Sequence, residues 1–301
     1  MREAKFSDIL LLILLGAIWG SSFFNIKIAT YSYEPFTLGL IRVFFASIPL
    51  IALCFYQKIK IEAFSKNWLS YAIIGACNIT IPFTLIALGT SKIDSYLAAM
   101  LMSTTPMSGS ILAHIFTKNE KITFLKSIGI IIGFSGIVFL FLDKLVINSG
   151  NYLYVLIIII GSAFYSIGGI LTLKIKNKGN INVTTSTTIW ATIFLLPCSI
   201  IFEQPWNSTP TLDSTISLLY LGIVATGVAW LIRFRILTVN GLVFQTQVAY
   251  IIPIFGVIFG YFFMNETITW RVLVALIIII IGIYIVKKNN KEENPNAFRK
   301  Y

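Results

Sequence analysis

Apolar runs, each about 20 residues long, follow one another along nearly the whole chain. They lie near 8–29, 36–56, 68–88, 94–117, 123–142, 152–173, 183–202, 213–235, 242–263 and 269–286. An α-helix rises about 1.5 Å per residue, so each run is long enough to cross a hydrocarbon core of about 30 Å. The runs are continuous rather than alternating, which favours helices over a barrel. The pattern predicts an all-α polytopic membrane protein with ten transmembrane helices and a polar cytoplasmic tail at 289–301.

The composition agrees with a membrane protein. Of 301 residues, 57% are hydrophobic and 12% are charged. A soluble chain of this size has too much surface in contact with water for such a composition. The net charge of +11 would suggest a nucleic-acid partner in a soluble protein. Here the basic residues gather in short segments between apolar runs, as topology signals do, so no nucleic-acid partner is expected.

The basic residues also distinguish the two faces of the membrane. With the N-terminus in the cytoplasm, the inner segments carry Lys58, Lys60, Lys66, Lys118, Lys121, Lys174, Lys176, Lys178, Arg233 and Arg235. The outer segments carry only Lys92 and Lys144, with Arg271 just inside the last run. Cytoplasmic loops of membrane proteins are rich in Lys and Arg. The sequence therefore predicts a bacterial cytoplasmic (inner) membrane protein with both termini in the cytoplasm.

A short phrase occurs twice, as NEKITF at 119–124 and as NETITW at 265–270. Gly136 and Gly282 are separated by the same distance as these two phrases, which indicates an internal duplication. The duplication divides the chain into two five-helix repeats, at 8–142 and 152–286. Because five is an odd number, the second repeat enters the membrane from the opposite side. Inverted repeats of this kind are common in secondary transporters, where they surround a shared central cavity.

The repeated phrase also has a local chemistry. Its asparagine suits a turn, and Thr123 or Thr269 can cap the helix that follows. Glu120 and Glu266 place a negative charge near a helix start, which favours a structural role at the repeat ends. Pro106 and Pro253 precede the two glutamates by similar distances. Each proline is expected to interrupt its helix near mid-membrane, where a broken helix lines a cavity and can act in gating.

The sequence offers no chemistry for a reaction. None of its acidic residues falls in the middle of an apolar run, and its one histidine has no partner nearby in sequence. There is no Cys/His cluster and no phosphate-binding loop, so no catalytic residue, metal or cofactor is expected. The missing mid-membrane carboxylate also argues against a proton-coupled drug exporter.

A solute-binding role is expected for a set of polar and aromatic residues within the runs. Arg42 lies inside the second run, where a charge is costly, and its guanidinium suits a carboxylate or a phosphate. A structural alternative is that Arg42 braces the carbonyl end of a neighbouring helix. The other candidates are Trp19, Ser22, Asn78, Ser103, Thr104, Trp230, Gln247 and Tyr250.

Three pairs of glycines are spaced four residues apart, at 16 and 20, 129 and 133, and 256 and 260. Within membranes this spacing allows two helix backbones to approach closely. The pairs are expected to be packing surfaces between helices.

The chain resembles the EamA-type ten-helix branch of the drug/metabolite transporter superfamily over about residues 8–288. The resemblance is carried by AIWGSSFFNIKIAT at 17–30, by LIRVFFASIPL at 40–50, and by the proline-to-glutamate blocks of both halves. The second half differs at its first helix, where Phe164-Tyr165-Ser166 replaces Trp-Gly-Ser. The resemblance implies a central cavity walled mainly by helices 1, 3, 4, 6, 8 and 9, with helices 5 and 10 peripheral.

These observations predict a secondary transporter of a small metabolite that works by alternating access. An amino acid or a related amphipathic solute is favoured, because the expected cavity is polar, nearly uncharged and walled by aromatic residues. Nucleotide-like or sugar-derived metabolites are alternative solutes, and a membrane-embedded enzyme is the alternative from another class. The expected partners are the solute and the lipid bilayer, and a homodimer is compatible with the sequence.

Overall fold

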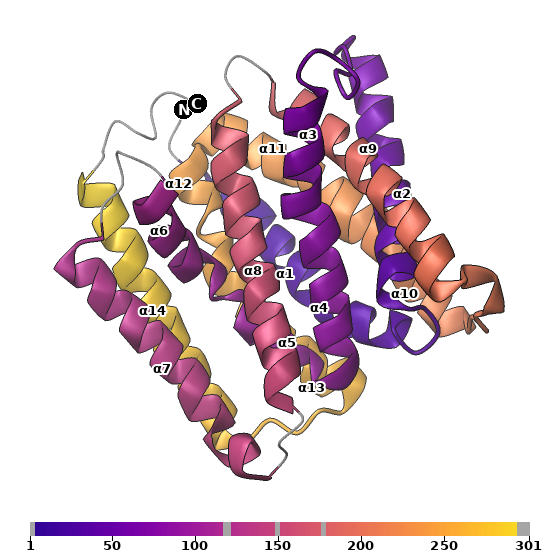
Figure 1. Cartoon of the computed structure of the whole chain (residues 1–301). Helices are drawn as coiled ribbons and strands as arrows, with labels where there is room; N and C mark the ends of the chain where they lie inside the picture. The colour runs from indigo at the N-terminus through magenta and orange to yellow at the C-terminus, as the bar shows by residue number, and fades with distance from the viewer. Residues whose placement is uncertain (1–3, 117–121, 148–150, 176–178, 294–301) are drawn as a thin grey trace.

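The computed structural model describes residues 4–116, 122–147, 151–175 and 179–293, and within these ranges the chain is helical with no strand (Figure 1). The α-helices are α1 (Phe6–Ala29), α2 (Pro35–Tyr56), α3 (Trp68–Gly75), α4 (Ile81–Lys92), α5 (Ser95–Met102), α6 (Thr105–Phe116), α7 (Phe124–Ile147), α8 (Asn151–Leu173), α9 (Asn180–Cys198), α10 (Leu212–Gly222), α11 (Ala229–Asn240), α12 (Leu242–Gln245), α13 (Val248–Met264) and α14 (Trp270–Glu293). Shorter segments are η1 (Ala76–Thr80), η2 (Ser199–Glu203), η3 (Pro205–Asn207) and η4 (Ile223–Val228).

The helices confirm the predicted fold class, an all-α polytopic membrane protein. In the described part of the chain, six helical stretches are long and apolar enough to cross a membrane, and three shorter ones are also apolar. Where a π-helical segment joins two helices, the stretch is continuous, as in Trp68–Lys92 and Leu212–Asn240. Each predicted run corresponds to one such stretch or to a pair of helices separated by a short break.

One predicted boundary is wrong. The eighth run was expected to end at residue 235, but helix α11 continues to Asn240. Arg233 and Arg235 therefore lie in a helix and not in a cytoplasmic loop. The turn to α12 is made by Gly241 alone, whose φ of 88° is a conformation that glycine adopts readily. The two arginines looked like loop residues because charge usually marks the end of an apolar run.

Both halves of the chain contain a π-helical segment at matching positions. Segment η1 begins at Ala76 and η4 begins at Ile223, a separation close to that of the repeated phrase. A π-turn widens a helix and shifts the hydrogen-bond partners of its carbonyl groups, and it occurs often at functional sites. The sequence pattern gave no sign of these segments, because a π-turn leaves the apolar run uninterrupted.

Two helices are broken near the prolines of the repeats. Helices α5 and α6 are separated at Ser103 and Thr104, just before Pro106. Helices α12 and α13 are separated at Thr246 and Gln247, before Pro253. Pro253 itself lies inside α13, so the expectation that it interrupts its helix is wrong, because neighbouring helices allow a membrane helix to continue through a proline. At both breaks the backbone amides bond to the carbonyl three residues back, for example Thr104 to Leu101 at 3.0 Å. The local chain tightens there and leaves the α-helical hydrogen-bond pattern.

Glycines bring the helix backbones together, as expected from their spacing. A Cβ on Gly20 would meet Phe255 and the backbone of α13, and one on Gly256 would meet Ala99 of α5. Helix α13 is thereby held between α1 and α5. A second seam joins α7 and α14, where a Cβ on Gly282 would lie 2.5 Å from the Cα of Gly133 and 2.8 Å from the carbonyl oxygen of Gly129. Close backbone approach of this kind drives helix association in lipid.

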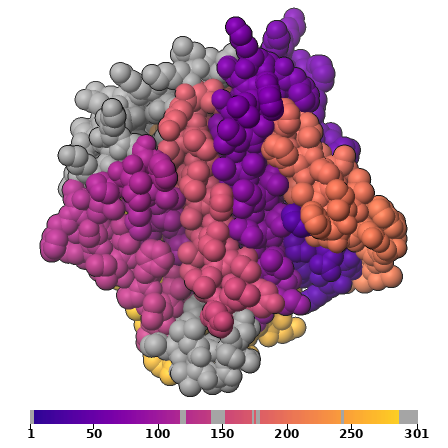
Figure 2. All heavy atoms as spheres, viewed as in Figure 1, coloured from indigo at the N-terminus to yellow at the C-terminus, as the bar shows by residue number. Residues whose placement is uncertain are grey.

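The outside of the bundle is apolar. Helices α7 and α14 lie side by side at one edge of the molecule (Figure 1), in the peripheral position that the family resemblance implies for helices 5 and 10. Figure 2 shows α8 at the surface between α7 and α4. Its exposed face carries Leu153, Leu156 and Ile160, each about half exposed. A large exposed apolar face at helical spacing is suited to contact with lipid.

Two glutamates bind the N-termini of helices distant in sequence. Glu266 accepts hydrogen bonds from the amides of Ser95 and Tyr96, at 2.5 and 3.1 Å, and from the Ser95 hydroxyl. Glu203 accepts from the amides of Phe36 and Thr37 at 2.7 and 2.6 Å. The first amides of a helix have no partner within it, and the helix dipole favours a negative charge there. These carboxylates therefore fix the starts of α5 and α2.

A lysine binds the C-terminal end of a helix, where the last carbonyl groups have no partner within the helix. The Lys27 ammonium donates to the carbonyl groups of Ser91 and Ile93, at 3.0 and 2.9 Å, where α4 ends. The short link between α4 and α5 is thus held by Lys27 on one side and Glu266 on the other. We call the end of the bundle that carries residues 30–34, 93–94, 204–211 and 265–269 the clamped face.

The α7–α14 seam generates the first prediction. Gly282→Ala should destabilise the protein by about 1–3 kcal/mol, because the new methyl group meets backbone atoms that cannot move aside. Thermal unfolding of the purified protein in detergent measures this effect. Gly169→Ala is the matched control, since a Cβ at Gly169 meets no atom within 4 Å. Equal melting temperatures for the two variants would contradict the close approach at Gly282.

The clamped face generates the second prediction. Glu266→Ala should lower the stability by about 1–3 kcal/mol, because the amides of Ser95 and Tyr96 lose their acceptor. Glu34→Ala removes a charge from the same face but no side-chain capping bond, and should have little effect. Thermal unfolding in detergent compares the two variants. If Glu34→Ala is as destabilising as Glu266→Ala, the effect arises from net charge and not from the clamp.

Candidate functional site

Arg42 lies inside the bundle, on α2, with 8% of its surface exposed. Its Nε donates a hydrogen bond of 2.9 Å to the hydroxyl of Thr226 in η4. Its guanidinium carbon lies 4.1 Å from the centre of the Phe83 ring on α4, which is a cation–π contact. Within the described residues Arg42 has no carboxylate partner. A buried charge without a counterion is costly in a membrane, which makes Arg42 the strongest candidate for function.

Glycines on α10 and η4 explain how Thr226 comes so close to Arg42. A Cβ on Gly222 would lie 2.9 Å from the carbonyl oxygen of Arg42, and one on Gly227 would lie 2.6 Å from Pro49. Helix α2 therefore crosses this helix at backbone contact. The Thr226 hydroxyl donates to the carbonyl of Leu221 at 2.8 Å, so its lone pairs face Arg42. The arginine is held by one nitrogen, which leaves its two terminal nitrogens without a hydrogen bond in the described part of the chain.

Aromatic side chains surround the guanidinium. Phe83 and Tyr165 pack against each other with ring centres 6.2 Å apart, and the Tyr165 hydroxyl lies within electrostatic reach of Arg42. Helices α2, α4, α8 and segment η4 thus meet around one cation. Chemically, this group of residues can bind an anion through the free end of the guanidinium, beside apolar ring faces.

The structure places Trp19, Ser22 and Asn78 on the helices next to this group. Trp19 donates from its indole nitrogen to the carbonyl of Ala225, one residue before Thr226, at 3.2 Å. The Ser22 hydroxyl bonds to its own helix, at the carbonyl of Ile18. Asn78 lies in η1, where its backbone packs against Gly168 of α8. Trp19 is therefore tied to the element that orients Arg42.

Ser103 and Thr104 lie at the break between α5 and α6, and both are buried. Ser103 bonds to the carbonyl of Ala99, and Thr104 bonds at 2.6 Å to the hydroxyl of Ser162 on α8. Ser108 likewise bonds to Ser166 of α8 at 3.1 Å. These hydroxyls join α8 to the broken helix, and the structure does not bring Ser103 or Thr104 to Arg42.

Trp230 lies on α11, and Gln247 and Tyr250 lie at the start of α13. Trp230 on α11 contacts the ring of Phe234 edge to face, with centres 6.0 Å apart. Gln247 lies exposed at the second break, and Tyr250 is partly buried at the start of α13. Helix α13 packs on α1 and α5, whereas the Arg42 group is built from α2, α4, α8 and η4.

The repeated phrase shows the expected turn and cap. Asn265 has a left-handed φ of 52°, and the Thr123 hydroxyl accepts from the amide of Lys126 at the start of α7. Glu266 does not serve the helix that follows it but the start of α5. Glu120 lies outside the described residues.

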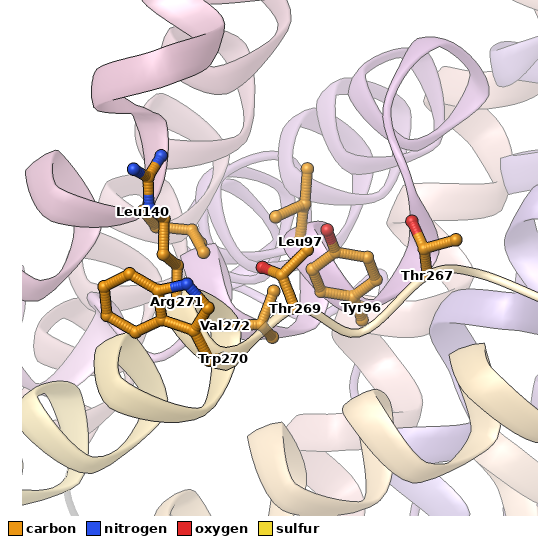
Figure 3. A pocket seen from close by; sticks show the side chains of 8 residues that line it. All are labelled: Tyr96, Leu97, Leu140, Thr267, Thr269, Trp270, Arg271 and Val272. Carbon is orange, nitrogen blue, oxygen red and sulfur yellow. The ribbon is translucent and has the colours of Figure 1, made fainter.

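A cavity of about 350 Å³ lies at the clamped face (Figure 3), beside Tyr96, whose backbone amide donates to Glu266. Its lining includes Tyr96 and Leu97 of α5, Leu140 of α7, and residues before and at the start of α14. None of the candidate solute-binding residues lines it. The cavity is open to the surface beside the clamp and is separate from the Arg42 group.

Thr226, Phe83 and Tyr165 contribute to the Arg42 group but are not among the solute-binding residues expected from the sequence. One signal was present for Thr226, which is a lone hydroxyl in an apolar run between Gly222 and Gly227. Small residues flanking a polar one in a membrane helix mark a close crossing with another helix. No signal in the sequence marks the aromatic pair, because Phe and Tyr are frequent along the chain.

Comparisons with known proteins agree with this architecture. The "Uncharacterized transporter YoaV" of Bacillus subtilis is 23% identical over 269 residues, which cover 89% of this chain and 92% of that protein. The "Uncharacterized inner membrane transporter YedA" of Escherichia coli K12 is 24% identical, over 90% of this chain and 88% of its own length. A solved structure titled "Crystal structure of protein" shares the fold, with a TM-score of 0.68 and 14% identity, over 94% of this chain and 98% of its own. A family model matches residues 6–142 and 152–287, and the chain therefore belongs to the EamA-like transporter family.

Proposed function

We propose that this transporter is a secondary carrier of a small solute and that Arg42 binds the solute's anionic group. The observation that carries the proposal is a buried arginine with two free nitrogens and no carboxylate partner in the described residues. A structural arginine would be expected to use its terminal nitrogens within the protein. An amino acid or related amphipathic solute is favoured, because its carboxylate suits the guanidinium and its side chain suits the rings of Phe83 and Tyr165.

We place the clamped face outside the cell and both termini in the cytoplasm. The basic segments support this orientation, since those rich in Lys and Arg alternate with those that carry the clamps. Residues 8–142 and 152–286 then form two inverted repeats. In such carriers the two faces open in turn around one site, so the clamps of Glu266 and Glu203 must release when the outer face opens.

Counterflow in proteoliposomes tests the transport function. Vesicles are loaded with a mixture of unlabelled amino acids, and traces of labelled ones are added without an ion gradient. Accumulation of label would support a carrier for that amino acid. Failure with every amino acid would reject the favoured solute class, and vesicles loaded with nucleotide-like or sugar-derived metabolites then test the alternatives.

The third prediction concerns Arg42. Arg42→Ala should reduce counterflow by about 100-fold or more, because loss of a charged hydrogen bond to an anion costs roughly 3 kcal/mol. The fold should survive, since Thr226 keeps its bond to Leu221. Arg42→Lys keeps the charge but loses the planar fork, and should retain only part of the activity.

Arg235→Ala is the control for Arg42, since Arg235 is an exposed arginine on α11. It should leave counterflow nearly unchanged. Size-exclusion chromatography and thermal unfolding verify that each variant is folded. Normal transport by a folded Arg42→Ala protein would show that Arg42 only braces neighbouring helices.

A further inference from the structure

A second arginine lies inside an apolar helical stretch and lacks a hydrogen-bond or ion-pair partner in the described residues. Arg233 on α11 is partly buried, and its Nε is buried with no hydrogen-bond acceptor in the described residues. Its guanidinium carbon lies 5.0 Å from the centre of the Trp230 ring. Within the same residues Arg233 also has no ion pair. A buried guanidinium nitrogen that lacks an acceptor costs free energy, so its presence calls for an explanation.

Arg233 follows Thr226, the residue that orients Arg42, by seven positions on one continuous helical stretch. Seven residues are about two turns of a helix, so Arg233 lies roughly 10 Å further along this stretch than Thr226. Arg42 and Arg233 therefore lie at two different levels along the stretch. Under the proposed orientation, Arg233 is the level nearer the cytoplasm.

In the part of the chain that the structure describes, no carboxylate pairs with Arg233. Helix α11 packs against α1 and α12. The acid that α1 brings to α11 is Asp8, which accepts from Asn240 at 3.2 Å and from the amide of Lys5 at 2.8 Å. Asn240 lies two further turns along α11, so Asp8 serves the end of the helix. The acid of the same helical stretch, Asp213, lies at its opposite end.

Arg235 makes the contrast clear. It lies two residues later on α11 and is exposed, as expected for a charge that marks the edge of the membrane. A topology signal requires only an exposed charge such as Arg235. The burial of Arg233 Nε therefore has no explanation in topology, and Arg233 is a candidate for binding a ligand.

We propose that Arg233 is a second binding station for the transported solute, which receives the solute's carboxylate or other compact oxyanion on the cytoplasmic side of Arg42. This inference rests on the proposed carrier function and extends it. Two guanidinium groups in series select solutes by their anionic end, and Trp230 beside Arg233 offers an apolar ring for the rest of the molecule. Cationic solutes are repelled at both levels.

Fluorescence quenching of the purified protein in detergent tests the station without transport. Trp230 reports on Arg233, and its contribution is isolated by subtracting the signal of Trp230→Phe. Iodide, an anionic quencher, should be attracted by Arg233, whereas acrylamide is neutral. Arg233→Gln should lower the iodide quenching constant of Trp230 by about threefold or more at constant ionic strength, and leave acrylamide quenching unchanged. Arg235→Gln is the matched control and should change neither constant.

Competition then identifies the anion. Sodium acetate or inorganic phosphate is added at constant ionic strength, and relief of iodide quenching in the wild type but not in Arg233→Gln supports the station. Stronger relief by acetate assigns a carboxylate, and stronger relief by phosphate assigns a phosphate group. Equal iodide quenching in wild type and Arg233→Gln, or no relief by either anion, would overturn the proposal. Since no transport is measured, failed counterflow would not mimic either result.

Discussion

The absence of water from the hydrocarbon core governs this structure. Every backbone amide, carbonyl and charge placed there must find a partner within the protein or face a hydrated space. Within a helix most backbone amides and carbonyl groups are hydrogen-bonded to each other. At the helix ends these groups need partners from elsewhere in the protein. Glu266 and Glu203 accept from the free amides of α5 and α2, and Lys27 donates to the free carbonyl groups at the end of α4. Each of these partners comes from another segment of the chain, so the helix ends also connect the segments.

The same constraint explains how helices are arranged where lipid offers no hydrophobic driving force between them. Backbone contact replaces side-chain burial at Gly20, Gly256 and Gly282. At Gly222 the close approach has a chemical result, because it sets the Thr226 hydroxyl against Arg42. A glycine that serves packing thus also positions a charge. The packing of this crossing and the position of Arg42 are therefore linked.

Under the proposed carrier function, one face of the bundle opens while the other closes. The clamped face is held by charged hydrogen bonds that can form and break as units. The glycine seams hold pairs of helices at backbone contact. Helix α13 connects a glycine seam with a clamp. It packs on α1 through glycines and is followed by the segment that carries Glu266. Its movement relative to α5 would couple the clamp to the interior of the bundle.

Local patterns along the chain are enough to predict the helical class, the apolar runs and the packing role of the glycine pairs. Those properties follow from local composition and spacing, because the thickness of the bilayer sets the length of each apolar helix. The chain also identified Arg42, because a charge within an apolar run is visible without coordinates. The residues that contact Arg42 are visible only in the folded structure. The group of Thr226, Phe83 and Tyr165 comes from three other helices.

Other assignments depended on the tertiary structure for the same reason. Glu266 was expected to serve its own helix and instead binds α5, because a carboxylate at a loop reaches whichever free amides packing brings near. Arg233 had the sequence signature of a loop residue, and the π-turns left no mark on the apolar pattern. The spacing of apolar residues predicts which segments form helices that span the membrane. Which polar groups meet one another is fixed by helix crossings, and these depend on contacts between residues far apart in the chain.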